Sequence, residues 1–222
     1  MRWLNWRLAS RLSVLTMALL VVLVVAILNW RAGQGGSASG QAAGQPTASS
    51  SGLQGTLLDG RPAPSFRLTD QFGRSVSLAE FKGKPVVITF LYTHCPTVCP
   101  LTADKLHTVM QQLGDDAQRV AVLAISVDPV GDTQASALAF SNAHKMTTYW
   151  HFLIGSRAAL SPIWRAYSID AEAATANSST GSVAHTAVLY VLDKQGRERV
   201  LLGDDFIPSQ LTGDLQLLLK EE

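Results

Sequence analysis

The sequence of 222 residues contains few cysteines, few charged residues and no large excess of charge of either sign. Its two cysteines, Cys95 and Cys99, are too few for a fold built on disulfides, which needs several cysteines spread along the chain. Charged residues make up 16% of the chain and the formal net charge is +1, so nothing indicates a nucleic-acid-binding surface. Two cysteines only four positions apart indicate instead a local redox pair or part of a metal site.

The amino-terminal region contains basic residues but no acidic ones. Three arginines precede an uncharged apolar run over residues 12–28, and Trp30 and Arg31 follow it. A helix of about 17 residues is about 26 Å long, close to the ~30 Å hydrocarbon thickness of a bilayer. We therefore predict that residues 1–31 form a cytoplasmic flank and a single transmembrane anchor. A cleaved signal peptide is the alternative, because small residues follow at 37–39.

Either interpretation places the rest of the chain on the extracytoplasmic face of the cell membrane. Residues 32–55 consist mostly of Gly, Ala, Ser and Gln without a charge, and they contain too few large apolar groups to fold. We predict that this stretch is a flexible linker. Residues 56–222 have the alternating apolar and turn-forming residues of a compact domain, which we expect to be the extracytoplasmic part.

The domain shows the element order of an α/β, thioredoxin-like fold. Two runs rich in β-branched residues, 85–91 and 120–127, are typical of buried strands, and the helical pattern between them predicts a βαβ unit with parallel strands. A late antiparallel hairpin and a closing helix complete the order. The expected hairpin strands are 185–193 and 198–202, and the closing helix is 211–219. Further expected elements are strands 66–68, 76–78 and 150–154, and helices 133–145 and 158–167.

Cys95 and Cys99 lie where the first buried strand ends and a helix begins. The amides and dipole of a helix N-terminus stabilise a thiolate, which is the reactive and metal-binding form of cysteine. If both cysteines lie in one helical turn, their Cβ atoms are ~5–6 Å apart, and they can form a disulfide or bind one ion. Pro100 disfavours a helical conformation for Cys99, so the motif can instead be a separate turn, with the helix starting at Pro100. Two inert, buried cysteines are a further alternative.

Two thiolates favour a soft ion such as Cu(I), and an imidazole would add affinity for Cu(II) or Zn(II). His185 is the best candidate for a third ligand because it opens a core strand, and the loop entering that strand faces the cysteine motif in thioredoxin-like folds. His94 adjoins Cys95, but consecutive side chains usually point apart. The other histidines have the positions of ordinary surface residues: His107, on the exposed side of its helix, His144 and His151.

Two stretches of the sequence resemble a known family. Residues 90–100, Phe-Leu-Tyr-Thr-His-Cys-Pro-Thr-Val-Cys-Pro, resemble the signature of the Sco (SenC) copper-delivery proteins, and residues 126–129, Ser-Val-Asp-Pro, with Asp132-Thr133, resemble its second motif. The resemblance covers about residues 66–219.

The resemblance implies that Cys95, Cys99 and His185 bind copper, as Cu(I) or Cu(II), for the dinuclear copper centre of cytochrome c oxidase. The expected partner is then the copper-bearing subunit of the oxidase. The family usually has an acidic residue immediately before the histidine, where this chain has Ala184. Asp128 can supply a polar contact near the site or stabilise a turn.

Other functions of the cysteine pair remain open. A thiol–disulfide oxidoreductase that reduces partner cysteines needs both thiols but not His185. The thioredoxin motif has two residues between its cysteines, however, whereas this chain has three. A peroxiredoxin expects a threonine three positions before the reactive cysteine, where Tyr92 stands. The leading interpretation is a copper-binding assembly factor, a metallochaperone, and a weak thiol–disulfide oxidoreductase activity beside that role stays open.

Overall fold

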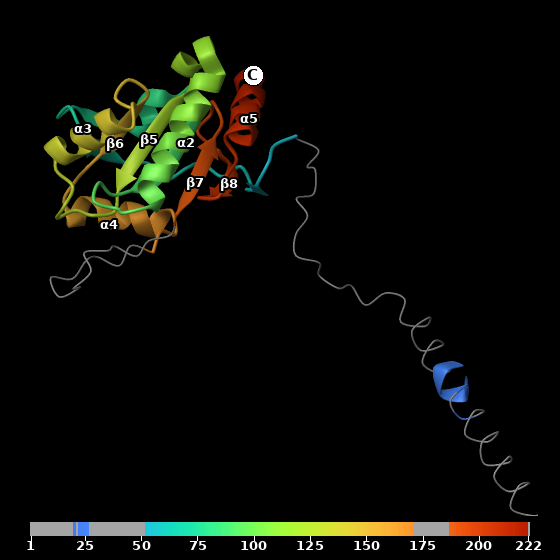
Figure 1. The fold of residues 1–222 in the computed structure, drawn as a ribbon. Helices are drawn as coiled ribbons and strands as arrows, with labels where there is room; N and C mark the ends of the chain where they lie inside the picture. The colour runs from blue at the N-terminus through green and yellow to red at the C-terminus, as the bar shows by residue number, and fades with distance from the viewer. Residues whose placement is uncertain (1–19, 21, 27–51, 171–186, 222) are drawn as a thin grey trace, which may run out of the picture. The chain divides into compact units, whose positions relative to one another are not determined.

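A computed structural model describes residues 20, 22–26, 52–170 and 187–221 (Figure 1). The chain divides into two units, Met1–Gln45 and Pro46–Glu222. In the first unit the described residues are helical and exposed. No helix among the residues described is long and apolar enough to cross a membrane. Most of the predicted anchor and linker lies outside the described residues.

The second unit contains a six-stranded sheet, a separate two-stranded sheet and helices packed around them. Its elements, in chain order, are β1 (Thr56–Leu57), β2 (Arg67–Thr69), β3 (Ser75–Ser77), η1 (Leu78–Phe81), β4 (Val86–Leu91), α2 (Val98–Leu113), η2 (Gly114–Arg119), β5 (Ala121–Ser126), α3 (Gln134–Ala143), β6 (Trp150–Leu153), α4 (Arg157–Ala166), β7 (Val188–Leu192), β8 (Glu198–Gly203) and α5 (Pro208–Lys220).

The strand order of the large sheet is β1-β8-β7-β4-β5-β6. The neighbours β4, β5 and β6 run parallel, whereas β7 and β8 are antiparallel to their neighbours. The predicted βαβ unit, late hairpin and closing helix are therefore confirmed. The expected hairpin turn is also present, because Asp193 Oδ1 accepts hydrogen bonds from the N–H groups of Gln195 and Arg197 at 3.0 and 2.9 Å. Strand β1, which has only two residues, is an addition to the prediction.

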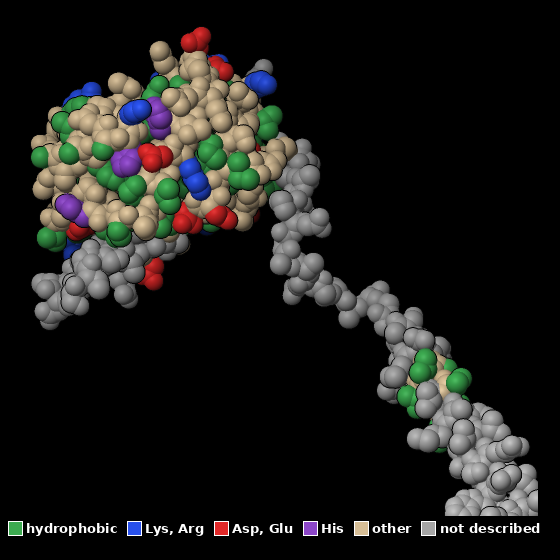
Figure 2. Space-filling view, in the orientation of Figure 1, with side chains coloured by type: hydrophobic (Ala, Val, Ile, Leu, Met, Phe, Trp, Pro, Cys, Tyr) green, Lys and Arg blue, Asp and Glu red, His purple; other side chains and the backbone are tan. Residues whose placement is uncertain are grey.

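The two central strands are buried along their whole length. Every residue of β4 and β5 is buried, as expected for β-branched strands covered on both faces. Helices α2 and α5 lie side by side (Figure 1), and the hydroxyl of Thr212 donates to Gln112 Oε1 at 2.8 Å. Because β4 and β5 are buried along their whole length, they give a rigid base for the loops at their carboxyl ends. On the surface, charged side chains are scattered over the face of the domain shown in Figure 2.

Asp214 is a buried carboxylate on α5 that contacts the beginning of the domain. Its Oδ1 accepts a hydrogen bond from the N–H of Gln54 at 2.8 Å, and its Oδ2 has no hydrogen-bond partner among the described residues. Burial raises the pKa of Asp214 to about 6, and the Gln54 hydrogen bond opposes this rise only partly. Because the folded pKa lies above the unfolded value, the stability contributed by the protonated form is lost as pH rises through about 6.

We predict that Asp214→Asn stabilises the protein at pH 8 and has little effect at pH 4. The amide keeps an oxygen for the Gln54 N–H and carries no charge, so the gain at pH 8 should be on the order of 1–2 kcal/mol. Urea unfolding of the full-length chain at the two pH values measures the difference. An equal effect of the substitution at both pH values would contradict this assignment.

Candidate functional site

The candidate site lies at the carboxyl ends of β4 and β5, which meet at the same edge of the sheet because the two strands are parallel. The loop of residues 92–97 leads from β4 to α2, and the loop of residues 127–133 leads from β5 to α3. This edge is where ligands commonly bind in open α/β sheets. The two sequence motifs that resemble the Sco (SenC) family, residues 90–100 and residues 126–129 with 132–133, include most of these two loops.

The carboxylate of Asp132 joins these two loops. Its Oδ1 accepts hydrogen bonds from the backbone N–H and the hydroxyl of Thr93, at 2.8 and 2.7 Å. Its Oδ2 accepts a hydrogen bond from the Ser126 hydroxyl at 2.6 Å. Asp132 is only 7% exposed, and burial raises the pKa of its carboxyl, while the hydrogen bonds from Ser126 and Thr93 act in the opposite direction. The sequence predicts no role for Asp132 beyond its place in the second motif.

Asp128 stabilises the turn of its own loop, which is one of the two roles expected for it. Its Oδ1 accepts hydrogen bonds from the N–H groups of Val130 and Gly131, at 3.2 and 2.9 Å. Its own N–H donates to the hydroxyl oxygen of Ser126 at 3.1 Å. Ser126 therefore connects Asp128 and Asp132, and both carboxylates have defined positions.

The structure matches neither of the two geometries left open for the cysteines. Helix α2 begins at Val98, so Cys99 and Pro100 lie in its first turn, and Cys95 lies in the loop before it. The alternative in which the helix starts at Pro100 is thus wrong, and so is the alternative that places both cysteines in one helical turn. Pro100 is tolerated because the first N–H groups of a helix have no partner within the helix, so its missing N–H breaks no bond.

Cys95 provides a hydrogen-bond acceptor at the start of this helix. The side chain of Thr97, the residue that precedes the helix, makes no capping hydrogen bond. Instead the backbone N–H of Cys99 donates to Cys95 Sγ at 3.3 Å. The two cysteines are not joined by a disulfide, and their side chains interact, since a hydrogen bond from the Cys99 side chain reaches Cys95.

The two thiols differ in exposure and in acidity. Cys95 is half-buried, and although burial raises the pKa of its thiol, the hydrogen bonds from the Cys99 backbone and side chain, Thr97 and Tyr92 outweigh this and lower the pKa. Cys99 is fully buried, and burial raises the pKa of its thiol far above the usual value. Cys95 is therefore the thiol that reaches solvent and ionises first.

Among the sequence-predicted metal ligands, Cys95 and Cys99 come together, whereas His185 and its neighbour Ala184 lie outside the described residues. His144 and His151 are half-buried, and each contacts a carboxylate far from it in the sequence. His144 Nδ1 lies 2.7 Å from Asp104 Oδ1, and His151 Nδ1 lies 3.0 Å from Asp70 Oδ2.

His107 is a correction to the sequence analysis. It was expected on the exposed side of its helix, but it is half-buried, with its ring centroid 5.8 Å from that of Tyr149. The helical pattern identifies the core-facing side of α2, but it does not reveal that Tyr149, outside the helix, covers part of the opposite side.

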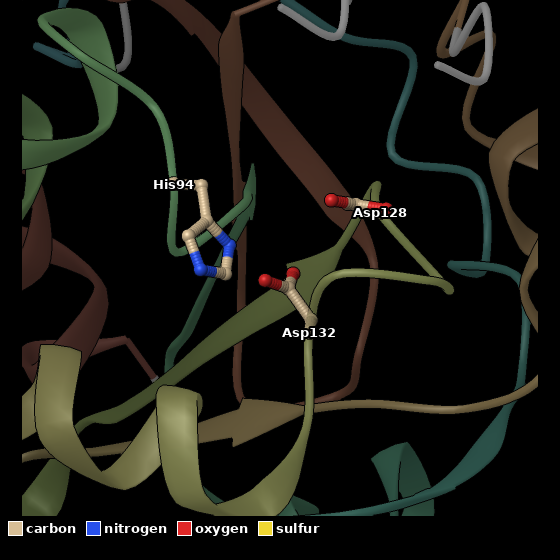
Figure 3. Close-up of side chains that lie close together, drawn as sticks. All are labelled: His94, Asp128 and Asp132. Carbon is tan, nitrogen blue, oxygen red and sulfur yellow. The ribbon is translucent and has the colours of Figure 1, made fainter. Parts of the chain in front are cut away.

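His94 is exposed and lies beside the two carboxylates of the neighbouring loop. Its Nδ1 is 3.1 Å from the hydroxyl oxygen of Thr93. Figure 3 shows its ring turned toward Asp128 and Asp132. Ligand atoms of these three side chains all lie within 4.8 Å of one another. This cluster was not predicted from the sequence, since its members come from two loops more than thirty positions apart.

Comparison with known proteins connects this site with one family. The family model described as SCO1/SenC matches residues 56–220. A mitochondrial protein SCO2 homologue from Bos taurus is 30% identical over 134 residues, which are 59% of this chain and 50% of that protein. An SCO1 protein homologue from Bacillus subtilis is 29% identical over 40% of this chain and 47% of that protein. The chain thus spans about half the length of these curated relatives.

Two solved structures share both the fold and part of the sequence. The structure of Bradyrhizobium japonicum ScoI with copper bound has a TM-score of 0.63 and 32% identity, and covers 70% of this chain and 98% of that one. The solution structure of apo Sco1 from Thermus thermophilus has a TM-score of 0.61 and 30% identity, and covers 73% of this chain and 94% of that one. These matches confirm the resemblance stated from the two motifs.

We predict that Asp132→Ala destabilises the protein strongly, by about 2–4 kcal/mol, because it removes the acceptor of three hydrogen bonds at a buried position. Urea unfolding of the full-length chain measures the loss. Asp115→Ala is the matched control, because Asp115 is exposed and its removal should change stability by less than about 0.5 kcal/mol. Equal unfolding free energies for the two variants would show that Asp132 does not hold the loops together.

Proposed function

Because the chain belongs to the SCO1/SenC family, we propose that its folded domain binds copper and delivers it to the dinuclear copper centre of cytochrome c oxidase. Copper is thus the cargo that the protein transfers and not a resident cofactor. The observation that carries the proposal is the position of Cys95 and Cys99 around the first turn of α2, where the Cys99 N–H contacts Cys95 Sγ. Two thiolates form a soft donor pair that favours Cu(I), and the helix N-terminus favours the negative charge on sulfur.

We propose His185 as the third ligand. Strand β7 runs antiparallel to β4, and Leu189 pairs with Thr89. The chain therefore enters β7 from the edge of the sheet at which β4 ends, which is the edge that carries Cys95. This direction supports His185, three positions before Val188, as a residue able to reach the thiols. An imidazole ligand adds affinity for Cu(II), which prefers nitrogen ligands.

The predicted anchor and linker fit this proposal. Residues 1–31 would hold the protein in the membrane, and residues 32–55 would let residues 56–222 move on its extracytoplasmic face. An uncharged linker of about 24 residues has a reach of about 25–30 Å. The copper-bearing subunit of the oxidase is the proposed partner on that face.

The alternative function is reduction of a partner's disulfide, and the asymmetry of the two thiols favours it. The Cys95 thiolate would attack a partner disulfide, form a mixed disulfide and release one partner thiolate. Cys99 would then attack Cys95 Sγ, release the second partner thiolate and leave the pair oxidised. Two electrons pass to the partner, and Cys99 gives up its thiol proton. This chemistry requires both cysteines but not His185.

We predict that the cysteines and His185 contribute differently to copper binding. Cys95→Ser and Cys99→Ser should each greatly weaken Cu(I) binding because one soft ligand is lost, whereas His185→Ala should weaken Cu(II) binding more than Cu(I) binding. The measurement is copper per full-length chain after dialysis against a chelator, together with oxidase assembly in cells that carry each variant. His144→Ala is the control, because its ring contacts Asp104 instead, and it should behave as the unmodified chain.

The reductase alternative predicts a different pattern. His185→Ala would then leave oxidase assembly and copper content unchanged, while both cysteine variants would fail to assemble the oxidase. That result would overturn copper delivery in favour of thiol exchange.

A further inference from the structure

The cluster of His94, Asp128 and Asp132 is not used by the proposed copper site. One ligand atom from each side chain lies within 4.8 Å of the other two. His94 belongs to the loop after β4, and the two carboxylates belong to the loop after β5 (Figure 3). His94 is exposed, Asp128 is half-buried and Asp132 is buried, so the cluster is open to solvent on the histidine side.

Hydrogen bonds already orient the two carboxylates. Thr93 and Ser126 donate to Asp132, and the N–H groups of the turn donate to Asp128 Oδ1. Among the described residues Asp128 Oδ2 accepts no hydrogen bond, and a carboxylate oxygen that accepts one bond can still offer a lone pair. Such outer hydrogen bonds are what fixes the ligands of a metal site.

Gly131 gives the histidine and the carboxylate the room to approach each other. A Cβ at this position would overlap Asp128 Oδ2 and would lie 3.3 Å from His94 Nδ1. The backbone itself does not require glycine here, because Gly131 is not among the residues with positive φ. The absence of a side chain at position 131 therefore keeps the cluster open between these two side chains.

We propose that His94, Asp128 and Asp132 bind one divalent cation of the borderline class, such as Zn²⁺, at a site separate from the two thiols. A neutral imidazole and two carboxylates supply one nitrogen and at least two oxygen ligands. The total charge of −2 on the two carboxylates balances the +2 charge of the ion. Binding would require His94 and Asp128 to move so that the three ligand atoms, now within 4.8 Å of one another, lie about 2.0–2.2 Å from a shared centre. The soft Cu(I) ion, in contrast, prefers the sulfur atoms of Cys95 and Cys99.

The test uses the full-length chain with Cys95→Ser and Cys99→Ser, so that no thiolate can bind the probe. We expect this variant to bind one Zn²⁺ per chain in calorimetric titration. Adding His94→Ala should lower the Zn²⁺ affinity at least about tenfold. Loss of a residue that only hydrogen-bonds a metal ligand already lowers metal affinity by about that factor, and loss of a ligand itself should cost no less. Adding His144→Ala or His185→Ala should leave the affinity unchanged. His94 is exposed, so its substitution preserves the fold, and circular dichroism checks this.

Gly131→Ala provides a second test that removes no ligand. Its new methyl group would occupy the space between Asp128 Oδ2 and His94 Nδ1, so Zn²⁺ affinity should fall by about tenfold or more. Gly213→Ala is the matched control, because a Cβ there meets no atom within 4 Å and Zn²⁺ affinity should stay the same.

Absence of stoichiometric Zn²⁺ binding in the double cysteine variant, or equal affinity with and without His94, would overturn the proposal. The outcome is independent of copper delivery. His94→Ala in the chain with both cysteines should still bind Cu(I), and loss of copper binding by the cysteine variants would test only the proposed function.

Discussion

The carboxylate of Asp132 accepts hydrogen bonds from Thr93 on one loop and from Ser126 at the end of the neighbouring strand. These contacts fix the path of the chain immediately before Cys95 and the path of the chain that carries Asp128. A buried carboxylate is costly unless it is hydrogen-bonded, so the fold tolerates Asp132 only while both loops stay in place. The position of Cys95 against the first turn of α2 depends on this link, and so does the proximity of His94 to the acidic loop.

Much of the fold follows from local patterns in the sequence. The β-branched runs that form β4 and β5 predict buried parallel strands, and the residues after them predict the positions of the loops. The pair Cys95 and Cys99 is predicted together with its place at the start of a helix. The start of helix α2 could not be predicted, because two preferences of Pro100 oppose each other. Proline disfavours a helical conformation of the preceding residue, Cys99, but in the first helical turn its missing N–H costs no hydrogen bond, and in the structure Cys99 is helical.

Contacts between distant loops carry little signal in the sequence. Asp132 and Thr93 are 39 positions apart, and nothing in either local sequence indicates that one binds the other. The same holds for His94, whose side chain was expected only to point away from Cys95, and for Gly131, whose importance depends on what lies opposite it. Such residues are recognised once the parallel pairing of β4 and β5 brings their loops to one edge. That edge carries the two sulfur atoms of Cys95 and Cys99 and, from the second loop and His94, a group of nitrogen and oxygen atoms.

We propose that Cys95 and Cys99 together bind the copper. X-ray absorption spectroscopy at the copper edge, on the reduced full-length chain loaded with one Cu(I), tests it most directly because the spectrum counts the sulfur ligands. We expect two sulfur ligands in the unmodified chain and one in the Cys99→Ser variant. A copper ion bound only by nitrogen and oxygen, or a spectrum unchanged by Cys99→Ser, would contradict it.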